Sequence, residues 1–236
     1  MLDLGAGTGS LTLAAARRWP GARVVALDAS GAMLDVARSR IMQTEVESDR
    51  FEWLVADAAD IPLDDGAVEL VASSFLLQLP GDRPAVLREV RRVLRPGGSF
   101  SYVTWLADDL VVPADAAYHG LLGDIEDGDD DDVDEDHFRS PRSGDYGSLE
   151  QARDELAAAG FEDVAVVDDE LRYAWTAESY LAFKVDYDDH ERFDALDSAR
   201  RQQLLVALGE RLATLPPDAF EVRGPLVAAV ARRTAG

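Results

Sequence analysis

Strand-like and helix-like patterns of apolar residues alternate along the first half of the chain. The strand-like runs are short and rich in β-branched residues, and they occupy residues 1–4, 22–28, 51–56, 69–79 and 99–106. Between them, apolar positions recur at helical spacing in residues 10–18, 31–40 and 82–94. Regular alternation of strands with helices is typical of an α/β fold built on a parallel, doubly wound sheet.

The second half of the chain adds further helices and two more strands. Ser148 and Gln151 are spaced as in a capping box, and Gly160 is a helix-ending residue, so the intervening segment is predicted to be a helix. We therefore expect a seven-stranded sheet in a single domain, residues 1–236. The other elements predicted here are a strand at 163–175, helices at 177–184 and 195–215, and a strand at 225–232.

A glycine-rich turn separates the first strand from the first helix. Gly5, Gly7 and Gly9 follow Asp3 at alternate positions, and the helical pattern starts at Ser10. Glycine suits a backbone that adopts positive φ or that a ligand approaches closely. The free N–H groups at the start of a helix favour a negatively charged group. The turn therefore predicts a site for a nucleotide-like cofactor at the strand ends.

The acidic residue that ends the second strand supports a nucleoside ligand. Asp28 lies 19 residues after Gly9, and the two oxygens of a carboxylate can accept hydrogen bonds from both ribose hydroxyls. Ser30 is better placed than Asp28 to cap the following helix. An acid at this position is also expected in folds that bind NAD. Asp28 therefore indicates a nucleoside but does not distinguish NAD from another nucleoside-containing cofactor.

The order of the motifs resembles the class I S-adenosylmethionine (SAM) methyltransferases, in particular the small-molecule branch that includes ubiquinone/menaquinone biosynthesis. The segments that carry the resemblance are LDLGAGTG, ALDAS, ADAADIPL and SSFLLQLPGDRPAVLREVRRVLRPGG. The resemblance implies a Rossmann-like α/β fold whose terminal strand lies antiparallel beside the fifth. It divides the domain into a SAM-binding half (1–106), an acidic loop insertion (107–147), and the remaining sheet with a helical cap (148–236).

The resemblance also assigns contacts to the methionine and ribose parts of SAM. The turn Gly5–Gly9 would hold the methionine end, with Asp3 near its ammonium group. Asp28 would accept hydrogen bonds from the ribose hydroxyls. Ser73 would offer backbone contacts beside the sulfonium.

The adenine contacts are assigned in the same way. Asp57 would take the adenine amino group and the backbone of Ala58 would face a ring nitrogen, although Asp57 also fits an ordinary turn residue. Met33 and Ile61 would flank the ring. The complete set of residues expected to bind the cofactor is Asp3, Gly5, Ala6, Gly7, Thr8, Gly9, Asp28, Ala29, Met33, Asp57, Ala58, Ile61 and Ser73.

The chemistry that the resemblance implies is in-line displacement of the sulfonium methyl group by a small-molecule acceptor. The protein mainly has to align the reactants and exclude water, and it needs a general base only if the acceptor loses a proton. His119 is the best-placed candidate, but a surface histidine is the commoner case and we assign no catalytic residue. Tyr118, Tyr146, Tyr173 and Trp175 fit either an aromatic acceptor pocket or ordinary packing.

The sequence is also compatible with two other functions. The resemblance implies helical turns before the first strand that help to cover SAM, whereas this sequence starts at Met1 inside the strand, so a non-catalytic SAM-binding scaffold is one alternative. An NAD(P)-dependent oxidoreductase or epimerase is the other. The dinucleotide fingerprint has a third glycine where this chain has Ser10. A Tyr-x-x-x-Lys pair is also missing, since Lys184 is the only lysine.

The net charge of −23 and the isoelectric point near 4.3 limit the partners of the protein. The negative electrostatic field of this chain repels nucleic acid phosphates and anionic lipids, so we expect no nucleic acid partner. The acidic excess resembles proteins from salt-loving organisms, because the Debye length falls to roughly 3 Å at 1 M salt and screens the self-repulsion. We therefore expect poor stability at low salt.

Composition and patterning also bear on location and metal binding. The sequence has no cysteine, which excludes disulfides and thiolate metal sites. No signal peptide pattern and no apolar run of about 20 residues is present, so we expect a cytoplasmic protein without membrane insertion. Aligning Gly128 with the glycine of a calcium-binding EF-hand loop puts Gly123 and Ile125 at ligand positions, which fails. The acidic run 123–136 is therefore predicted to be a solvated loop, and no metal site is expected.

Overall fold

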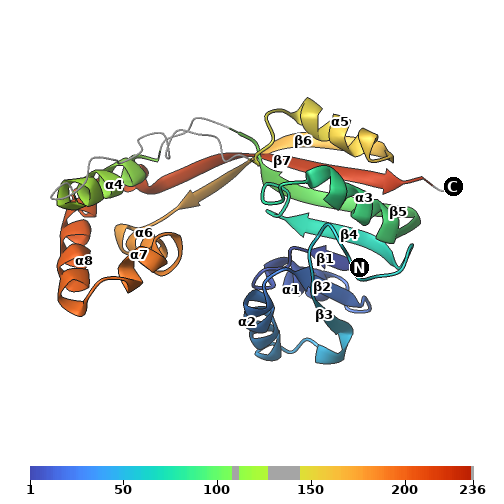
Figure 1. Cartoon of the computed structure of the whole chain (residues 1–236), viewed down its shortest axis with the longest axis horizontal. Helices are drawn as coiled ribbons and strands as arrows, with labels where there is room; N and C mark the ends of the chain where they lie inside the picture. Colours follow the sequence, from blue (N-terminus) through green and yellow to red (C-terminus); the bar gives the residue numbers. More distant parts are fainter. Residues whose placement is uncertain (108–111, 127–143, 235–236) are drawn as a thin grey trace. The chain divides into compact units, whose positions relative to one another are not determined.

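The computed structural model describes residues 1–107, 112–126 and 144–234, and the chain forms two compact units (Figure 1). The first, which we call the sheet unit, consists of Met1–Ala107, Pro141–Asp169 and Pro225–Gly236. The second, the helical unit, consists of Asp108–Ser140 and Glu170–Gly224. The division into a SAM-binding half, an insertion and a cap stays a prediction.

A seven-stranded sheet organises the fold, with strand order β3-β2-β1-β4-β5-β7-β6. Neighbouring strands from β3 through β5 pair in parallel, whereas β7 pairs antiparallel with β5. The predicted doubly wound, mostly parallel sheet with an antiparallel terminal strand is confirmed. The strands are β1 (Leu2–Leu4), β2 (Val24–Asp28), β3 (Phe51–Val55), β4 (Val68–Ser74), β5 (Leu94–Trp105), β6 (Phe161–Ala174) and β7 (Glu221–Arg233).

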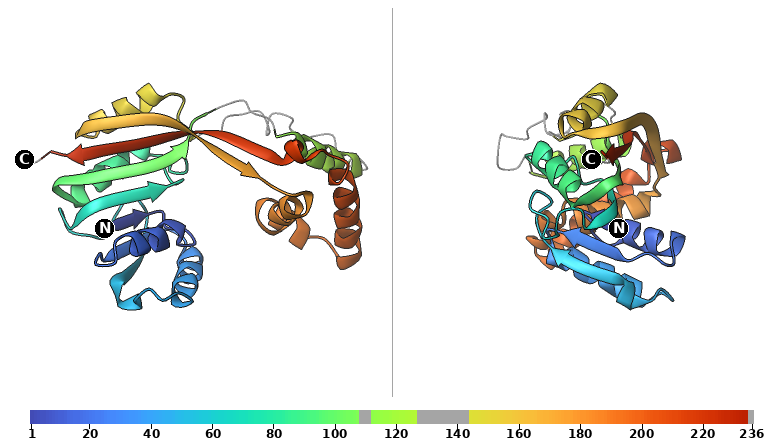
Figure 2. Two further views of the ribbon diagram at one scale, coloured as in Figure 1. Left: turned by 180° about the vertical axis from the view of Figure 1, so that it is seen from behind. Right: turned by 90° about the vertical axis from the view of Figure 1, so that its right-hand side faces the viewer.

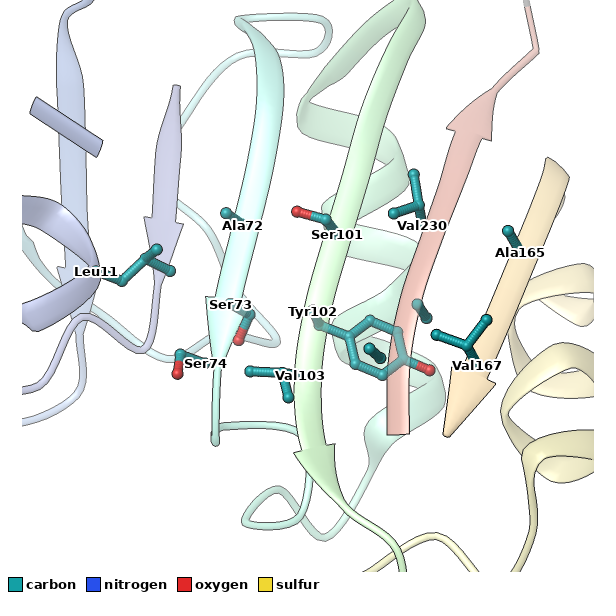
Figure 3. A pocket seen from close by; sticks show the side chains of 12 residues that line it. Leu11, Ala72, Ser73, Ser74, Ser101, Tyr102, Val103, Ala165, Val167 and Val230 are labelled. Atoms are coloured by element: carbon teal, nitrogen blue, oxygen red, sulfur yellow. The ribbon is translucent and has the colours of Figure 1, made fainter. Parts of the chain in front are cut away.

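Helices pack on both faces of the sheet unit (Figure 2). On one face, α1 and α2 contact β2, and on the other, α3 and α5 pack behind the strands as they are viewed in Figure 3. The main core lies between the strands and this second pair of helices, where Val90, Phe100 and Leu156 are fully buried. The helices are α1 (Ser10–Arg18), α2 (Gly31–Met42), α3 (Arg83–Val93) and α5 (Leu149–Ala158), and a short 3-10 helix, η1, spans Ser48–Arg50.

The helix starts largely follow the predicted caps. The hydroxyl of Ser30 accepts a hydrogen bond from the N–H of Met33 at 3.3 Å, which confirms it as the cap of α2. The hydroxyl of Ser148 accepts the N–H of Gln151 at 3.1 Å and caps α5. The Gln151 side chain, however, accepts the N–H of Gly147 at 2.8 Å rather than that of the capping residue. The predicted capping box is thus displaced by one residue.

The fifth strand begins earlier than the predicted start at Ser99. It starts at Leu94, which pairs with Val68, and the register shifts before Ser99 pairs with Leu70. The residues between the predicted helix at 82–94 and the predicted strand at 99–106 are therefore part of β5 and form a bulge, where Gly97 adopts a φ of 76°. A bulge inserts extra residues into one strand and leaves the ladder on either side intact.

The helical unit has its own core. Tyr118, Phe193 and Leu208 are fully buried in it, and the ammonium group of Lys184 lies 2.9 Å from the carboxylate of Asp115. None of the helices that the structure describes is both long and apolar enough to cross a membrane. The elements of this unit are α4 (Pro113–Glu126), α6 (Ala177–Phe183), the π-helix η3 (Lys184–Asp188), α7 (His190–Asp194), α8 (Ser198–Leu212) and the 3-10 helix η4 (Pro217–Phe220).

The acidic loop predicted for residues 107–147 is wrong over Pro113–Glu126, which form helix α4. Ala114, Tyr118 and Leu122 recur every four residues and are all buried, so they form an apolar stripe on one side of this helix. Residues 127–143, which hold most of the acidic run, lie outside the described part of the chain.

Candidate functional site

The glycine-rich turn follows β1 directly and is anchored to the neighbouring strand. The N–H groups of Gly5 and Ala6 both donate to the carbonyl oxygen of Leu27 at 2.9 Å. Gly5, Gly7 and Gly9 have φ values of 74°, 51° and 81°, in the left-handed region that favours glycine. Gly9 is also the N-cap residue of α1, so the turn ends where the free N–H groups of the helix begin.

The three glycines have different surroundings. A Cβ atom on Gly5 would lie 2.8 Å from the Cβ of Leu76, and one on Gly9 would lie 2.8 Å from the Cβ of Ala37. A Cβ on Gly7 would meet no heavy atom within 4 Å. Gly5 and Gly9 are therefore required by packing, whereas Gly7 leaves open space through which a ligand can approach the main chain.

Asp28, at the end of β2, holds this turn in place. Its Oδ2 accepts the N–H of Gly7 at 2.8 Å and its Oδ1 accepts the N–H of Ser30 at 2.9 Å. Ala29, between them, is exposed. Each carboxylate oxygen keeps a further lone pair, so the ribose contact remains chemically available and stays a prediction.

Asp3 is a fully buried acid on β1. Its Oδ2 accepts a hydrogen bond from the hydroxyl of Thr12 at 2.5 Å. Its Oδ1 is buried and has no hydrogen-bond partner among the described residues. Burial raises the pKa of Asp3 to about 6, hydrogen bonds from Thr12 lower it, and the charge of Asp28 raises it further. Asp3 is thus a buried carboxylate with one oxygen still able to accept a donor.

The site lies at the point where the strand order reverses. β1 is flanked by β2 on one side and by β4 on the other, and ligands of α/β sheets bind at such a switch point, outside the carboxyl ends of the strands. Ser73 on β4 donates its hydroxyl to the carbonyl oxygen of Leu4 at 2.9 Å. An open cavity of about 410 Å³ extends over β4, β5, β7 and β6, and Leu11, Ala72 and Ser73 line its end nearest β1 (Figure 3).

The residues expected around the adenine ring lie near β3 and α2. Asp57 is exposed, and its Oδ1 accepts the N–H of Ala59 at 2.8 Å, which is the geometry of a turn residue. Ala58 is 9% exposed and Ile61 is 2% exposed within the main core. Met33, in the first turn of α2, is 40% exposed. These adenine contacts stay predictions.

Two residues that support the turn were missed from the sequence. Thr12 had a signal, because it is the polar member of the stripe that α1 buries with Ala15 and Ala16. Arg40 had none. Its Nη1 atom donates to the carbonyl oxygen of Thr8 at 2.7 Å and to the Thr8 hydroxyl at 3.0 Å, across 32 residues of sequence. Arg40 thereby fixes the part of the turn that precedes Gly9.

The aromatic residues considered for an acceptor pocket differ in exposure. Tyr118, in the helical unit, and Tyr146, in the sheet unit, are fully buried, which favours the packing interpretation for both. Tyr173 is 49% exposed, and its ring contacts that of Trp175 edge-on with a centroid distance of 4.5 Å. The acceptor-pocket interpretation therefore stays a prediction for Tyr173 and Trp175 alone.

His119 lies on α4 in the helical unit and is partly buried. Burial lowers the pKa of His119, and the charge of Lys184 lowers it further, against the opposing effect of Asp115 and Asp189. A lowered pKa favours the neutral imidazole, which is the form that a general base requires. The structure assigns no catalytic role to His119.

A family model described as a methyltransferase domain matches residues 1–98. The class I methyltransferase resemblance is confirmed. The matched residues include Asp3, the glycine-rich turn, Asp28 and Ser73, so all of the residues expected to bind the cofactor lie within the match.

Two relatives illustrate how far the similarity extends. The malonyl-[acyl-carrier protein] O-methyltransferase of Geobacter sulfurreducens is 33% identical over 176 residues, which cover 73% of this chain and 60% of that protein. The demethylmenaquinone methyltransferase of Clavibacter sepedonicus is 45% identical over 98 residues, 42% of this chain and 38% of that protein. The chain spans less than two thirds of the length of the curated relatives that it matches first.

The fold beyond the methyltransferase domain also has counterparts among solved structures. Phosphoethanolamine N-methyltransferase 2 of Haemonchus contortus, in complex with S-adenosylhomocysteine, superposes with a TM-score of 0.57 at 20% identity. The superposition covers 99% of this chain and 48% of that one. At this identity the likeness establishes the Rossmann-like fold alone.

Proposed function

We propose that this protein is a SAM-dependent methyltransferase that transfers a methyl group to a small-molecule acceptor. The observation that carries the proposal is the glycine-rich turn at the switch point of the sheet, with open space at Gly7 and a buried acid, Asp3, beside it. The match of residues 1–98 to a methyltransferase domain supports it.

The residues present fit SAM at three points. The unpartnered Oδ1 of Asp3 can accept a hydrogen bond from the ammonium group of the cofactor. The open space at Gly7 admits a ligand against the main chain. The lone pairs that Asp28 keeps can accept hydrogen bonds from ribose hydroxyls. A sulfonium and an ammonium group also suit a chain whose net charge is −23.

The bound cofactor supplies an electrophilic methyl group on its sulfonium. The residues of this chain bind and orient it. Asp28 and Arg40 keep the turn in one conformation, which lowers the entropy lost on binding. Ser73 ties β4 to the end of β1 next to the cavity. Transfer then depends on alignment of the acceptor and exclusion of water, and alignment alone can supply about 7–11 kcal/mol of the barrier.

The acceptor is a small molecule in this proposal, and the relatives suggest where to begin. Malonyl-[acyl-carrier protein] and demethylmenaquinone appear in the names of two relatives and are the first acceptors to assay. We also propose that the protein works at high salt, on the basis of its net charge. A cytoplasmic location stays a prediction.

Calorimetric titration in molar KCl tests the cofactor. We expect saturable binding of SAM and S-adenosylhomocysteine and no binding of NAD. Asp28→Ala should weaken SAM binding by about 10- to 100-fold, because it removes a charged acceptor and the hydrogen bond that fixes Gly7. Glu52→Gln, which removes an exposed acid from the edge strand β3, is the matched control and should bind SAM normally.

The outcomes distinguish a SAM-dependent methyltransferase from an NAD-dependent enzyme. Binding of NAD in place of SAM would contradict a methyltransferase. Equal loss of affinity in both variants would mean that overall charge, rather than the position of Asp28, governs binding. Methyl transfer to an acceptor from radiolabelled SAM is the decisive test of activity.

A further inference from the structure

Thr12 joins helix α1 to strand β1 through a buried polar contact. Both Thr12 and Asp3 are fully buried, and the hydroxyl of Thr12 donates to Oδ2 of Asp3 at 2.5 Å. The other side chains that α1 buries are those of Ala15 and Ala16. A hydroxyl buried among apolar side chains destabilises the fold unless it forms a hydrogen bond. The hydroxyl of Thr12 forms one with the carboxylate of Asp3, which is a charged acceptor.

The contact leaves the Asp3 carboxylate asymmetric. Oδ2 is occupied by the Thr12 hydroxyl, whereas Oδ1 has no hydrogen-bond partner among the residues that the structure describes. A buried acceptor without a partner is destabilising, and more so when it is charged. The two oxygens are therefore distinct, and Oδ1 is the one whose hydrogen-bonding capacity is not used by the described residues.

The asymmetric carboxylate lies beside the open cavity. Asp3 is in register with Ala72 of β4, and Thr12 follows Leu11 on α1. Ala72 and Leu11 both line the cavity (Figure 3). A neighbour of Asp3 in the sheet and a neighbour of Thr12 in the sequence thus line a ligand-sized space, while Asp3 and Thr12 lie next to its wall.

We propose that Thr12 is a positioning residue for the cofactor. By holding one oxygen of Asp3, it directs the other oxygen to the α-ammonium group of SAM. The inference rests on the proposed function, since it names the group of the cofactor that Asp3 binds and the residue that orients Asp3. A residue that merely tied α1 to β1 would affect all ligands of the site equally.

The pH dependence of binding follows from the same contact. An ammonium group binds the ionised carboxylate, so affinity should fall as the pH decreases through the pKa of Asp3, about 6. Asp28 is the other titratable group whose charge acts on Asp3, and it raises the pKa. The hydrogen bond from the Thr12 hydroxyl lowers it, so removal of the hydroxyl should move the midpoint to higher pH.

The test compares two ligands that differ only in the ammonium group, S-adenosylhomocysteine and its deaminated analogue. The proteins are the unchanged chain, Thr12→Val, which has nearly the same shape without the hydroxyl, and Thr12→Ser, which restores the hydroxyl. We expect the unchanged protein to prefer S-adenosylhomocysteine by about 10- to 100-fold. Thr12→Val should reduce this preference by about 3- to 10-fold, and Thr12→Ser should largely restore it. The carboxyl resonance of Asp3 in the ligand-free protein should titrate at higher pH in Thr12→Val.

Each result decides a different question. If Thr12→Val kept the full preference, or lost affinity equally for both ligands, Thr12 would be structural and the inference would be overturned. If the Asp3 resonance titrated identically in Thr12→Val and the unchanged chain, the contact would not set the state of Asp3 and the inference would again fail. If the unchanged protein bound neither ligand in molar KCl, the proposed cofactor itself would be wrong.

Discussion

Replacement of Gly9 and of Gly7 by alanine should separate the packing role of the turn from its binding role. Both glycines have positive φ, which costs an alanine about 1–2 kcal/mol. At Gly9 the new Cβ would also lie 2.8 Å from the Cβ of Ala37, and overpacking of this kind adds about 1–3 kcal/mol. Gly9→Ala should therefore lower the free energy of unfolding by about 2–5 kcal/mol. Gly7→Ala, which meets no heavy atom within 4 Å, should lower it by only about 1–2 kcal/mol.

The effects on SAM binding should follow the opposite order, with the larger loss of affinity in Gly7→Ala. The space that Gly7 leaves open is where we place the cofactor, so Gly7→Ala should weaken SAM binding by at least about tenfold despite its smaller effect on stability. Urea denaturation and calorimetric titration, both in molar KCl, measure the two quantities on the same preparations.

A double-mutant cycle tests the cause assigned to Gly9. Ala37→Gly removes the opposing Cβ at a helix-propensity cost of about 1 kcal/mol. Combined with Gly9→Ala, it should recover about 1–3 kcal/mol relative to the sum of the single effects, because the contact at 2.8 Å is removed and the nearest remaining atom is the Cα of residue 37 at 3.2 Å. Strict additivity would refute the steric explanation. Equal destabilisation by Gly7→Ala and Gly9→Ala would refute the distinction between the two glycines.

Three further predictions concern charge. The folded-state pKa of Asp3, about 6, exceeds the ordinary value of 3.8, so its contribution to stability is fully present below about pH 4 and is lost as the pH rises through 6. Asp3→Asn should thus stabilise the ligand-free protein at neutral pH by up to about 3 kcal/mol and flatten this part of the pH profile, as urea titrations would show. The melting temperature should rise steeply with KCl, since salt screens the net charge of −23, and a flat response to KCl in calorimetry would contradict this. Arg83→Met should cost about 2–4 kcal/mol in urea denaturation by leaving the largely buried Glu155 without its cationic partner. Arg95→Met, whose partner Glu69 is exposed, should cost less than about 1 kcal/mol, and similar losses in both variants would refute the role of burial.

The sheet could be predicted from the sequence because its signals are local. The parallel strands contain short apolar runs, and the ends of β1 and β2 are marked by a glycine turn and a capping residue. Ser30 could be recognised as a cap in this way. The bulge in β5 could not, because the sequence around Gly97 fits a turn between elements as well as a bulge within one.

Helix α4 was missed because charge obscured its periodicity. Acidic residues in this region suggested a solvated loop, whereas the buried stripe of Ala114, Tyr118 and Leu122 depends on a partner surface supplied by residues far along the chain. Tertiary packing of this kind overrides local composition.

The candidate site was predictable in residue type and less so in geometry. Glycines at alternate positions and an acid after β2 indicated a nucleotide-like ligand. That Asp28 also accepts the N–H of Gly7 could not be deduced from the sequence. This hydrogen bond depends on the register between β1 and β2, which decides how close the end of β2 lies to the turn after β1. The asymmetry of Asp3 arises from α1 packing against β1, which no spacing along the sequence encodes.

The position of β7 in the sheet determines the order in which neighbouring strands can pair during synthesis. β7 follows both β5 and β6 in the sequence, yet it lies between them in the sheet and buries Val227, Ala229 and Ala231 in the main core. Until a ribosome has released this segment, β6 has no strand at its inner edge with which to pair. The edge of β5 is exposed during the same interval and offers a template for pairing with other chains. The nascent protein therefore carries unpaired edges on β5 and β6 until residues 221–233 emerge, and the insertion of this one strand covers both.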